Sequence, residues 1–321
     1  MTARIIGLCV AVAVAGASWA LTCSAWRHDQ ILAGISPVAP RQFDRLTLIT
    51  VGTGGAYENP RRRGPCTAVG WGSRVVLVDA GRGVAEALRA AGIPTSQPDT
   101  VFLTSLLPEN TVGLDDLLLA GWLDGRREPL RLVGPPGTRA LAEGLVAGHR
   151  RGTEGAAEAR GLPPANARFE TLEIAGGWSQ DRGSLAVSTG ALPDGPLDAL
   201  AYRFEWQGRS AVVGTTGWGR AALEELARGA NLLVHEAVFV LTPELAAGME
   251  MAVDPEVLRR EVALHTAIGD VGSVAQRAGV ETLVLVRLRP PPVYDIQLTS
   301  LIDDDFHGRI VVAEDGDEIT P

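Results

Sequence analysis

The polar turn inside the segment 101–116 comes nearer than any other part of the chain to a metal site in residue types and spacing. A β-branched and apolar strand end leads into the turn, and Gly113-Leu114 then opens a helix. Such a turn could hold zinc only through imidazole, thiolate or carboxylate groups about 2.0–2.3 Å from the ion. Between residues 105 and 110, Glu109 alone carries such a group. The turn therefore predicts the frame of a metal site without its usual ligands.

Histidines and their acidic neighbours are the other groups that could do acid–base or metal chemistry. His235 and Glu236 end an apolar strand, and the pair is interpreted as orienting loops by hydrogen bonds. His265 stands apart from it in the sequence and could act as a general acid or base near neutral pH. We expect the three remaining histidines to be solvated: His28, His149 and His307.

A run of three arginines offers a candidate site for an anion. Arg61, Arg62 and Arg63 could form charge-assisted hydrogen bonds with an oxyanion. A solvated loop is the other interpretation of this run. The glycine-rich stretch 52–55 lacks the lysine of a phosphate loop, and no Gly-x-Ser-x-Gly motif supports serine hydrolase chemistry.

Length and composition indicate an ordinary folded protein. The 321 residues can bury a large core, and 46% of them are hydrophobic while 21% are charged. The formal net charge of −9 argues against nucleic acid as the main partner, because binding to a phosphate backbone needs a concentrated basic face.

The apolar run 5–26 predicts a secretory signal peptide or a membrane anchor. It is long enough to cross a bilayer as one helix, and Ser18-Trp19-Ala20 places small residues at the spacing of a cleavage site. We divide the chain into this segment at 1–26, a linker at 27–45 and a folded domain at 46–321. The domain is expected outside the cytoplasm, either periplasmic or attached to the membrane through the N-terminal segment.

Strand-like and helical segments alternate from residue 46 onward. β-Branched runs predict strands at 46–52, 73–79, 100–104, 130–133, 169–174, 184–189, 200–206, 210–215, 232–235, 282–286 and 309–312. Apolar residues at helical spacing predict helices at 84–91, 114–123, 138–149, 221–228 and 268–278. The segment 151–167, rich in Gly, Ala and Pro, is expected to be a loop. Two blocks of strands with interleaved helices predict two sheets covered by helices on both outer faces.

Six short blocks follow one another along the chain in a recognisable order. They are Val51-Gly-Thr-Gly-Gly55, Arg63-Gly-Pro-Cys-Thr67, Val78-Asp79-Ala80-Gly81, Ala199-Leu-Ala-Tyr-Arg-Phe204, Val234-His235-Glu236-Ala237 and His265-Thr266. Together these blocks resemble the metallo-β-lactamase-fold hydrolases of the ribonuclease Z and arylsulfatase-like branch. The resemblance implies an α/β fold, a metallo-β-lactamase-type αββα four-layer sandwich, and descent from zinc-dependent hydrolases.

The resemblance also locates the positions at which such hydrolases carry metal ligands. Here those seven positions read Ser105, Leu107, Glu109, Asn110, Asp194, Thr215 and Arg287. No histidine remains among them, so the water activation of a binuclear zinc site should be absent. A guanidinium repels a divalent cation, and we expect Arg287 to pair with Glu109, Asp194 or both. An Arg287 that points to solvent is the other interpretation.

Three functions remain open from the sequence. The first is a non-catalytic pseudohydrolase without a cofactor that binds a small anion or a protein partner. The second is a metal-dependent phosphodiesterase or sulfatase with a relocated or single-metal site, for which His235, Glu236 and His265 are the donors. The third is a structural role, in which Leu107 and its neighbours fill the cleft. The resemblance implies that His265 lies near that cleft, where it could still move a proton.

Overall fold

The computed structural model describes residues 18–19, 21–24, 37–56, 61–214, 216–238, 247–248, 250, 254–257, 260, 264–289, 302 and 305–321. The chain forms two compact units, 1–39 and 40–321. In the first unit, residues 18–19 and 21–24 are helical. No helix within the described residues is both long and apolar enough to cross a membrane. Most of the apolar run 5–26 lies outside these residues.

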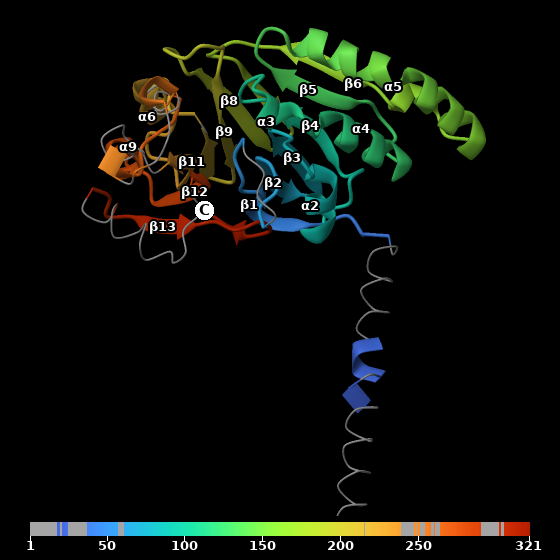
Figure 1. Cartoon of the computed structure of the whole chain (residues 1–321), viewed down its shortest axis with the longest axis horizontal. Coiled ribbons are helices and arrows are strands. Elements are labelled where there is room, and N and C mark those ends of the chain that lie inside the picture. The colour runs from blue at the N-terminus through green and yellow to red at the C-terminus, as the bar shows by residue number, and fades with distance from the viewer. Residues whose placement is uncertain are drawn as a thin grey trace, which may run out of the picture. The chain divides into compact units, whose positions relative to one another are not determined.

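The described residues of the second unit form two seven-stranded sheets (Figure 1). The first sheet has the strand order β14-β1-β2-β3-β4-β5-β6. Its strands from β3 to β6 run parallel, so their carboxyl ends open at one edge. The members are β1 (Phe43–Gly52), β2 (Cys66–Gly72), β3 (Arg74–Val78), β4 (Pro98–Phe102), β5 (Leu130–Gly134), β6 (Phe169–Glu173) and β14 (Glu318–Ile319).

The second sheet repeats this plan with the order β13-β12-β11-β10-β9-β8-β7. Strands β10 to β13 run parallel, while β7, β8, β9 and β10 are joined antiparallel. The members are β7 (Ser179–Arg182), β8 (Leu185–Ala191), β9 (Leu200–Trp206), β10 (Arg209–Val213), β11 (Leu232–Val238), β12 (Thr282–Arg289) and β13 (Arg309–Val312).

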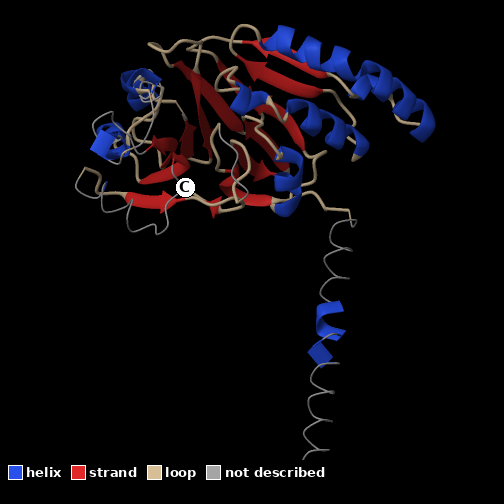
Figure 2. Cartoon of the chain, in the orientation of Figure 1, coloured by secondary structure: helices blue, strands red, loops and turns tan. Residues whose placement is uncertain are grey.

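Helices cover the outer face of each sheet, as Figure 2 shows. Val101 of the first sheet belongs to one buried apolar cluster with Leu88 and Leu117 of its helices. Leu285 of the second sheet belongs to another with Leu223 of α6 (Arg220–Leu226). These contacts bury the apolar stripe of each helix. The helices are α2 (Val84–Ala90), α3 (Pro108–Thr111), α4 (Leu114–Leu123), α5 (Thr138–Arg160), the 3₁₀ helix η1 (Pro164–Asn166), α6 (Arg220–Leu226) and α9 (Ile268–Ala278).

A third apolar cluster fills the space between the two sheets. Phe102 of β4 packs against Tyr202 and Phe204 of β9, with ring centroids 5.1 and 5.7 Å apart. The Tyr202 hydroxyl donates to the Leu103 carbonyl at 2.7 Å, which satisfies a buried polar group across the interface. With helices outside both sheets and this core between them, the αββα sandwich predicted from the sequence is confirmed.

The sequence-based prediction of a loop at 151–167 is wrong for its first ten residues. Helix α5 continues to Arg160 and ends at Gly161, which adopts a left-handed φ of 65°. Glycines weaken a helix, and α5 contains four of them. The last turns are held by the tertiary contact of Ala157 with Trp122. Strands β2, β7 and β14 have no counterpart in the sequence-based prediction.

Candidate functional site

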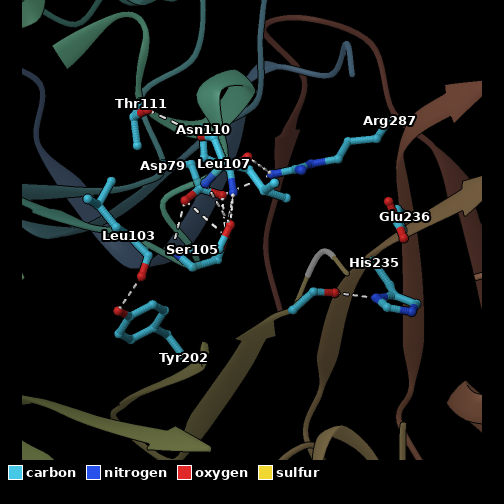
Figure 3. Close-up of polar contacts among 12 residues, drawn as sticks. Asp79, Leu103, Ser105, Leu107, Asn110, Thr111, Tyr202, His235, Glu236 and Arg287 are labelled. Carbon is cyan, nitrogen blue, oxygen red and sulfur yellow. Dashed lines mark hydrogen bonds and ion pairs between the residues drawn. The ribbon is translucent and has the colours of Figure 1, made fainter. Parts of the chain in front are cut away.

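The turn after β4 gathers small polar side chains into a closed network (Figure 3). Asn110 donates through Nδ2 to the hydroxyls of Thr104 at 3.0 Å and Ser105 at 2.9 Å. All three residues are fully buried. Pro108 starts α3 directly after Leu107, a position at which proline loses no helical hydrogen bond. The turn therefore holds Ser105 and Asn110 as structural partners of each other.

Arg287 reaches from the end of β12 in the second sheet into this network of the first sheet (Figure 3). Its Nη2 donates to Asp79 Oδ2 at 2.9 Å and to Asn110 Oδ1 at 2.8 Å. The side chains of Arg287 and Asp79 are only 6% and 2% exposed. The expected pairing of Arg287 with Glu109 or Asp194 is therefore wrong, and the solvent-exposed alternative is wrong as well. Among the described residues, its ion-pair partner is Asp79.

The backbone is constrained at both ends of this ion pair. Asp79 has φ 62° and Arg287 has φ 54°, in the left-handed region that side chains other than glycine rarely adopt. The Arg287 amide donates to the Thr53 carbonyl at 2.8 Å. Surrounding contacts hold both residues in this conformation, and such strain concentrates at functional or once-functional sites.

The Asp79 carboxylate is fully buried and accepts hydrogen bonds from more than one direction. Thr104 donates to it through its backbone N–H at 2.8 Å and through its hydroxyl. Burial raises the pKa of Asp79 to about 6, because desolvation of the charged form outweighs the lowering effects of Arg287 and Thr104. The nearby Glu109 adds to the rise.

The other ancestral ligand positions do not converge on one point. Leu107 packs against the apolar cluster of the second sheet that contains Leu192 and Trp218. Asp194 is exposed in the loop between β8 and β9, with φ 75°. Thr215 lies outside the described residues. Leu107 thus fills space at this edge of the sandwich, as expected for a structural role, and Asp194 faces away into solvent.

His235 and Glu236 lie on opposite faces of β11, because successive strand residues alternate. His235 is fully buried, and its Nδ1 donates to the Gly214 carbonyl while its Nε2 accepts from the Thr266 hydroxyl at 2.9 Å. Burial lowers the pKa of His235. Both ring nitrogens are occupied, so His235 has no lone pair for a metal.

Glu236 instead pairs with His265. His265 Nδ1 donates to Glu236 Oε2 at 3.0 Å, and the Thr266 amide donates to Oε1 at 3.1 Å. The Glu236 side chain is 2% exposed and that of His265 is 16% exposed. The structure thus brings His265 and Glu236 together, as a relocated site would need, and separates His235 from them.

The arginine run divides into different environments. Arg62 donates through Nη1 to the Thr53 hydroxyl and to the Ala313 carbonyl, both at 2.7 Å. Arg61 and Arg63 are exposed and line a cavity of about 210 Å³ together with Asp315. Two acidic side chains, those of Glu86 and Asp315, also line this cavity, which makes it a poor match for an anion.

The donor set at the ancestral positions does not fit zinc. Ser105 and Asn110 use their polar atoms on each other, Leu107 has none, and Arg287 brings a fixed positive charge. Within the described part of the chain, no group of three or more His, Cys, Asp or Glu side chains could hold a metal ion. No step of a zinc mechanism can be derived from these residues.

Two residues that organise the site were not identified as such from the sequence. Asp79 is in a block that resembles the family, yet its pairing with Arg287 spans 208 residues of chain. Thr266 links His235 to Glu236, since its hydroxyl contacts His235 and its amide contacts Glu236. The one signal in the sequence is that a buried neutral histidine needs a hydrogen-bond partner at each ring nitrogen, and Thr266 supplies the hydroxyl for one of them.

No protein-family model matches the chain. Among curated relatives, the ribonuclease Z of Mycolicibacterium paratuberculosis is 32% identical over 281 residues, which covers 84% of this chain and 96% of the relative. The ribonuclease Z of Mycobacterium marinum is 29% identical over 283 residues with the same coverage.

Solved structures agree on the fold. The metallo-β-lactamase fold protein YhfI of Bacillus subtilis superposes with a TM-score of 0.65 at 16% identity, over 87% of this chain and all of that one. The short form of human tRNase Z gives 0.59 at 18% identity, over 86% of this chain and 99% of that one. A zinc-bound PqqB of Methylobacterium extorquens gives 0.58 at 15% identity, over 86% of this chain and all of that one.

The relatives correct the expected location of the domain. The curated proteins that match 84% of this chain carry the name of a ribonuclease, which does not agree with an exported domain. The sequence-based expectation of a periplasmic or membrane-attached domain is therefore wrong. It rested on the length and apolar composition of the run 5–26 and on the small residues of Ser18-Trp19-Ala20.

The sandwich, the six blocks and the ribonuclease Z relatives all agree. At 32% identity over 84% of its length, this chain belongs to the ribonuclease Z family of metallo-β-lactamase-fold proteins.

Proposed function

We propose that this chain is a non-hydrolytic member of the ribonuclease Z family that uses the edge of the sandwich to bind a small anion or a protein partner. The observation that carries the proposal is the buried ion pair between Arg287 and Asp79. A guanidinium cannot lose its charge in a protein, so it opposes a divalent ion at this position. Nucleic acid is not proposed as the partner, because a net charge of −9 repels a phosphate backbone.

The packing of Leu107 supports the same proposal. A binuclear hydrolase needs an open position for water and substrate at its metals. Here an aliphatic side chain from the turn after β4 packs against the cluster around Trp218. Apolar packing and an internal ion pair thus stand at this edge of the two sheets, and neither supplies an activated water.

A hydrolase with a relocated or single-metal site is the second candidate, and two observations favour it. The relatives and structural neighbours include a ribonuclease, a tRNase and a diphosphatase. The Glu236–His265 pair also offers a carboxylate and an imidazole 3.0 Å apart at the edge of the sheet. These are two of the three protein donors that a catalytic zinc needs.

Metal content and activity together test both candidates. The purified full chain is loaded with zinc, desalted and analysed for bound metal, and it is assayed in parallel with bis(p-nitrophenyl) phosphate. We expect no retained zinc and no turnover. One or more zinc ions per chain, with turnover that His265→Ala abolishes, would overturn the non-hydrolytic proposal in favour of the second candidate.

A further inference from the structure

We propose that the groove between helix α5 and strand β6 binds an extended acidic peptide of a partner protein, which adds to the first sheet as a further strand. The groove has a volume of about 720 Å³, and it is lined by one flank of α5 and by residues 168–171. It contains none of the seven ancestral ligand positions, so the inference goes beyond the proposed function. A peptide that adds to a sheet edge gains affinity from backbone hydrogen bonds and specificity from alternate side chains.

Strand β6 has a free edge. It is the last strand in the order of the first sheet, and β5 is its neighbour among the described residues. The Arg168 carbonyl accepts from the Leu130 amide at 3.1 Å, and the Ile174 amide donates to β5 at 2.8 Å. Backbone groups alternate in direction along a strand, so those of Phe169 and Thr171 face away from β5. An extended peptide can pair with these groups.

The flank of α5 forms the second wall of the groove. Its lining residues recur at spacings of three and four from Arg139 to Arg150, so they lie on one side of the helix. Ala142 and Val146 share an apolar cluster with Phe169 of β6, which gives the groove an apolar floor. Both walls are about 16 Å long, at a rise of about 1.5 Å per helical residue and about 3.3 Å per strand residue. The groove therefore fits about five residues of extended chain.

The two walls are fixed to each other within the chain. Helix α5 runs alongside β6 (Figure 1). The Glu173 carboxylate at the end of β6 accepts from the backbone amides of Gly137 and Arg139 at 2.9 and 3.0 Å, which ties the start of α5 to the strand. Near the other end of α5, Ala157 packs against Trp122. A groove that is already formed lowers the entropic cost of binding a peptide.

The charges of the groove favour an acidic ligand. Three arginines and two glutamates line it, and all five are exposed: Arg139, Arg150, Arg168, Glu143 and Glu170. The ion pair that α5 forms within the described part of the chain is that of His149 with Asp115. Arg139 and Arg150 are therefore open to the carboxylates of a ligand. This local excess of positive charge lies on a chain of net charge −9, and it selects for negative side chains.

A peptide fits the groove better than a second copy of the chain or a nucleic acid. A twofold contact between copies would set the same patch against itself, and two patches with excess positive charge repel each other. A nucleic acid would bring its phosphates against the two glutamates of the groove. It also lacks the regular amide and carbonyl groups that pair with a strand edge.

The test is fluorescence anisotropy, in which the full chain is titrated into a fluorescein-labelled hexapeptide of alternating glutamate and valine. A hexapeptide of alternating lysine and valine with the same label is the control ligand. We expect saturable binding of one glutamate peptide per chain, about tenfold or more tighter than binding of the lysine peptide. Binding of the glutamate peptide should weaken as the salt concentration is raised, because exposed charges are screened.

Two variants test whether the peptide occupies the groove. Arg150→Glu reverses one charge of the α5 flank and should weaken binding about fivefold or more. Thr171→Pro removes an N–H of the free edge without touching the pairing with β5, and it should weaken binding about threefold or more. Arg151→Glu is the matched control, because Arg151 is the next residue of α5, is exposed and does not line the groove. It should bind the peptide as the parent does.

The inference is overturned if the glutamate peptide does not bind, if both peptides bind equally, or if Arg150→Glu and Arg151→Glu weaken binding to the same extent. A dimer in sedimentation that Thr171→Pro converts to a monomer would also overturn it, because a second copy would then occupy the edge. Unfolding midpoints of all variants separate loss of the groove from loss of the fold, and Arg150→Glu remains informative if Thr171→Pro is unstable. Zinc content does not enter this test, so its failure is distinguishable from failure of the proposed function.

Discussion

Arg287 and Asp79 form a buried ion pair of 2.9 Å that joins the end of β12 in one sheet to the turn after β3 in the other. Arg287 stands where the resemblance places a metal ligand, and Asp79 belongs to one of the six blocks that carry the resemblance. A positive charge is therefore still present at this edge, but it belongs to the chain itself. The consequences for stability can be measured separately from any ligand.

Removal of the Arg287 guanidinium should destabilise the fold, because Asp79 stays buried. Arg287→Met leaves Asp79 buried without a counter-charge, and we expect a loss of about 3–5 kcal/mol of unfolding free energy at pH 8. The double variant Arg287→Met/Asp79→Asn should recover most of that loss, because neutral replacement of a buried pair is often tolerated. Urea unfolding measures both. Losses that simply add in the double variant would show that the two residues do not interact.

The pKa of Asp79 predicts a pH dependence of stability. Its value rises from 3.8 to about 6 on folding, so between these values the folded state holds a proton that the unfolded state has lost. The contribution of Asp79 is thus fully present below pH 4 and falls by about 3 kcal/mol as the pH rises through 6. The unfolding free energies of the parent and of Asp79→Asn are measured from pH 4 to 7. The stability of the parent relative to Asp79→Asn should fall as the pH rises. Parallel curves would contradict the prediction.

His235 predicts the opposite slope. Burial lowers its pKa, so below the ordinary histidine pKa of 6.5 the unfolded state takes up a proton that the folded state refuses. Stability supplied by neutral His235 is therefore present above that value and is lost as the pH falls. The parent should lose stability relative to His235→Gln on acidification from pH 7, as followed by denaturant titration. The prediction is refuted if the unfolding free energies of the parent and of His235→Gln change with pH to the same extent.

Thr266 holds His235 in its neutral tautomer, and its hydroxyl can be removed without changing shape. Thr266→Val leaves the buried His235 Nε2 without its donor, and we expect a loss of about 1–3 kcal/mol. Thr138→Val, which removes a buried hydroxyl bonded to a backbone carbonyl far from the histidines, is the comparison. A loss in both that is independent of pH would mean that the histidine is not involved. The expected result is a loss for Thr266→Val that is largest above the ordinary histidine pKa of 6.5 and shrinks toward acid pH, because the lost hydrogen bond stabilises only neutral His235.

Gly113 allows the turn after α3 to approach the turn after β3. Its amide donates to the Ala80 carbonyl at 2.9 Å, and an added Cβ would come within 2.1 Å of the Gly81 carbonyl oxygen. Gly113→Ala should therefore cost about 1–3 kcal/mol or more through overpacking. Gly144→Ala in α5 meets no atom within 4 Å and should stabilise by about 0.5–1 kcal/mol. Thermal unfolding of the two variants gives the signs directly, and equal signs would refute this assignment of Gly113.

Periodicity along the chain determined much of the architecture. Helices α4 and α9 and strand β9 have the bounds that their apolar spacing predicts, because each must bury one regular stripe or face. The absence of histidine from all seven ancestral ligand positions can also be read from the sequence, since it depends only on residue identity. Helix α5 shows the limit of this reasoning, because its glycine-rich end is held by Trp122 from another helix.

The tertiary structure alone decided which of the site residues meet. Adjacent residues of a strand point to opposite faces, so the side chains of His235 and Glu236 do not lie together. Glu236 pairs with His265 instead. Arg287 reaches Asp79 across 208 residues and across both sheets, and the choice of Asp79 over Glu109 or Asp194 depends on how two layers dock. A buried charge takes the partner that lies within hydrogen-bond distance and shares its desolvation. That distance is set by the packing of the whole sandwich and by no local pattern in the chain.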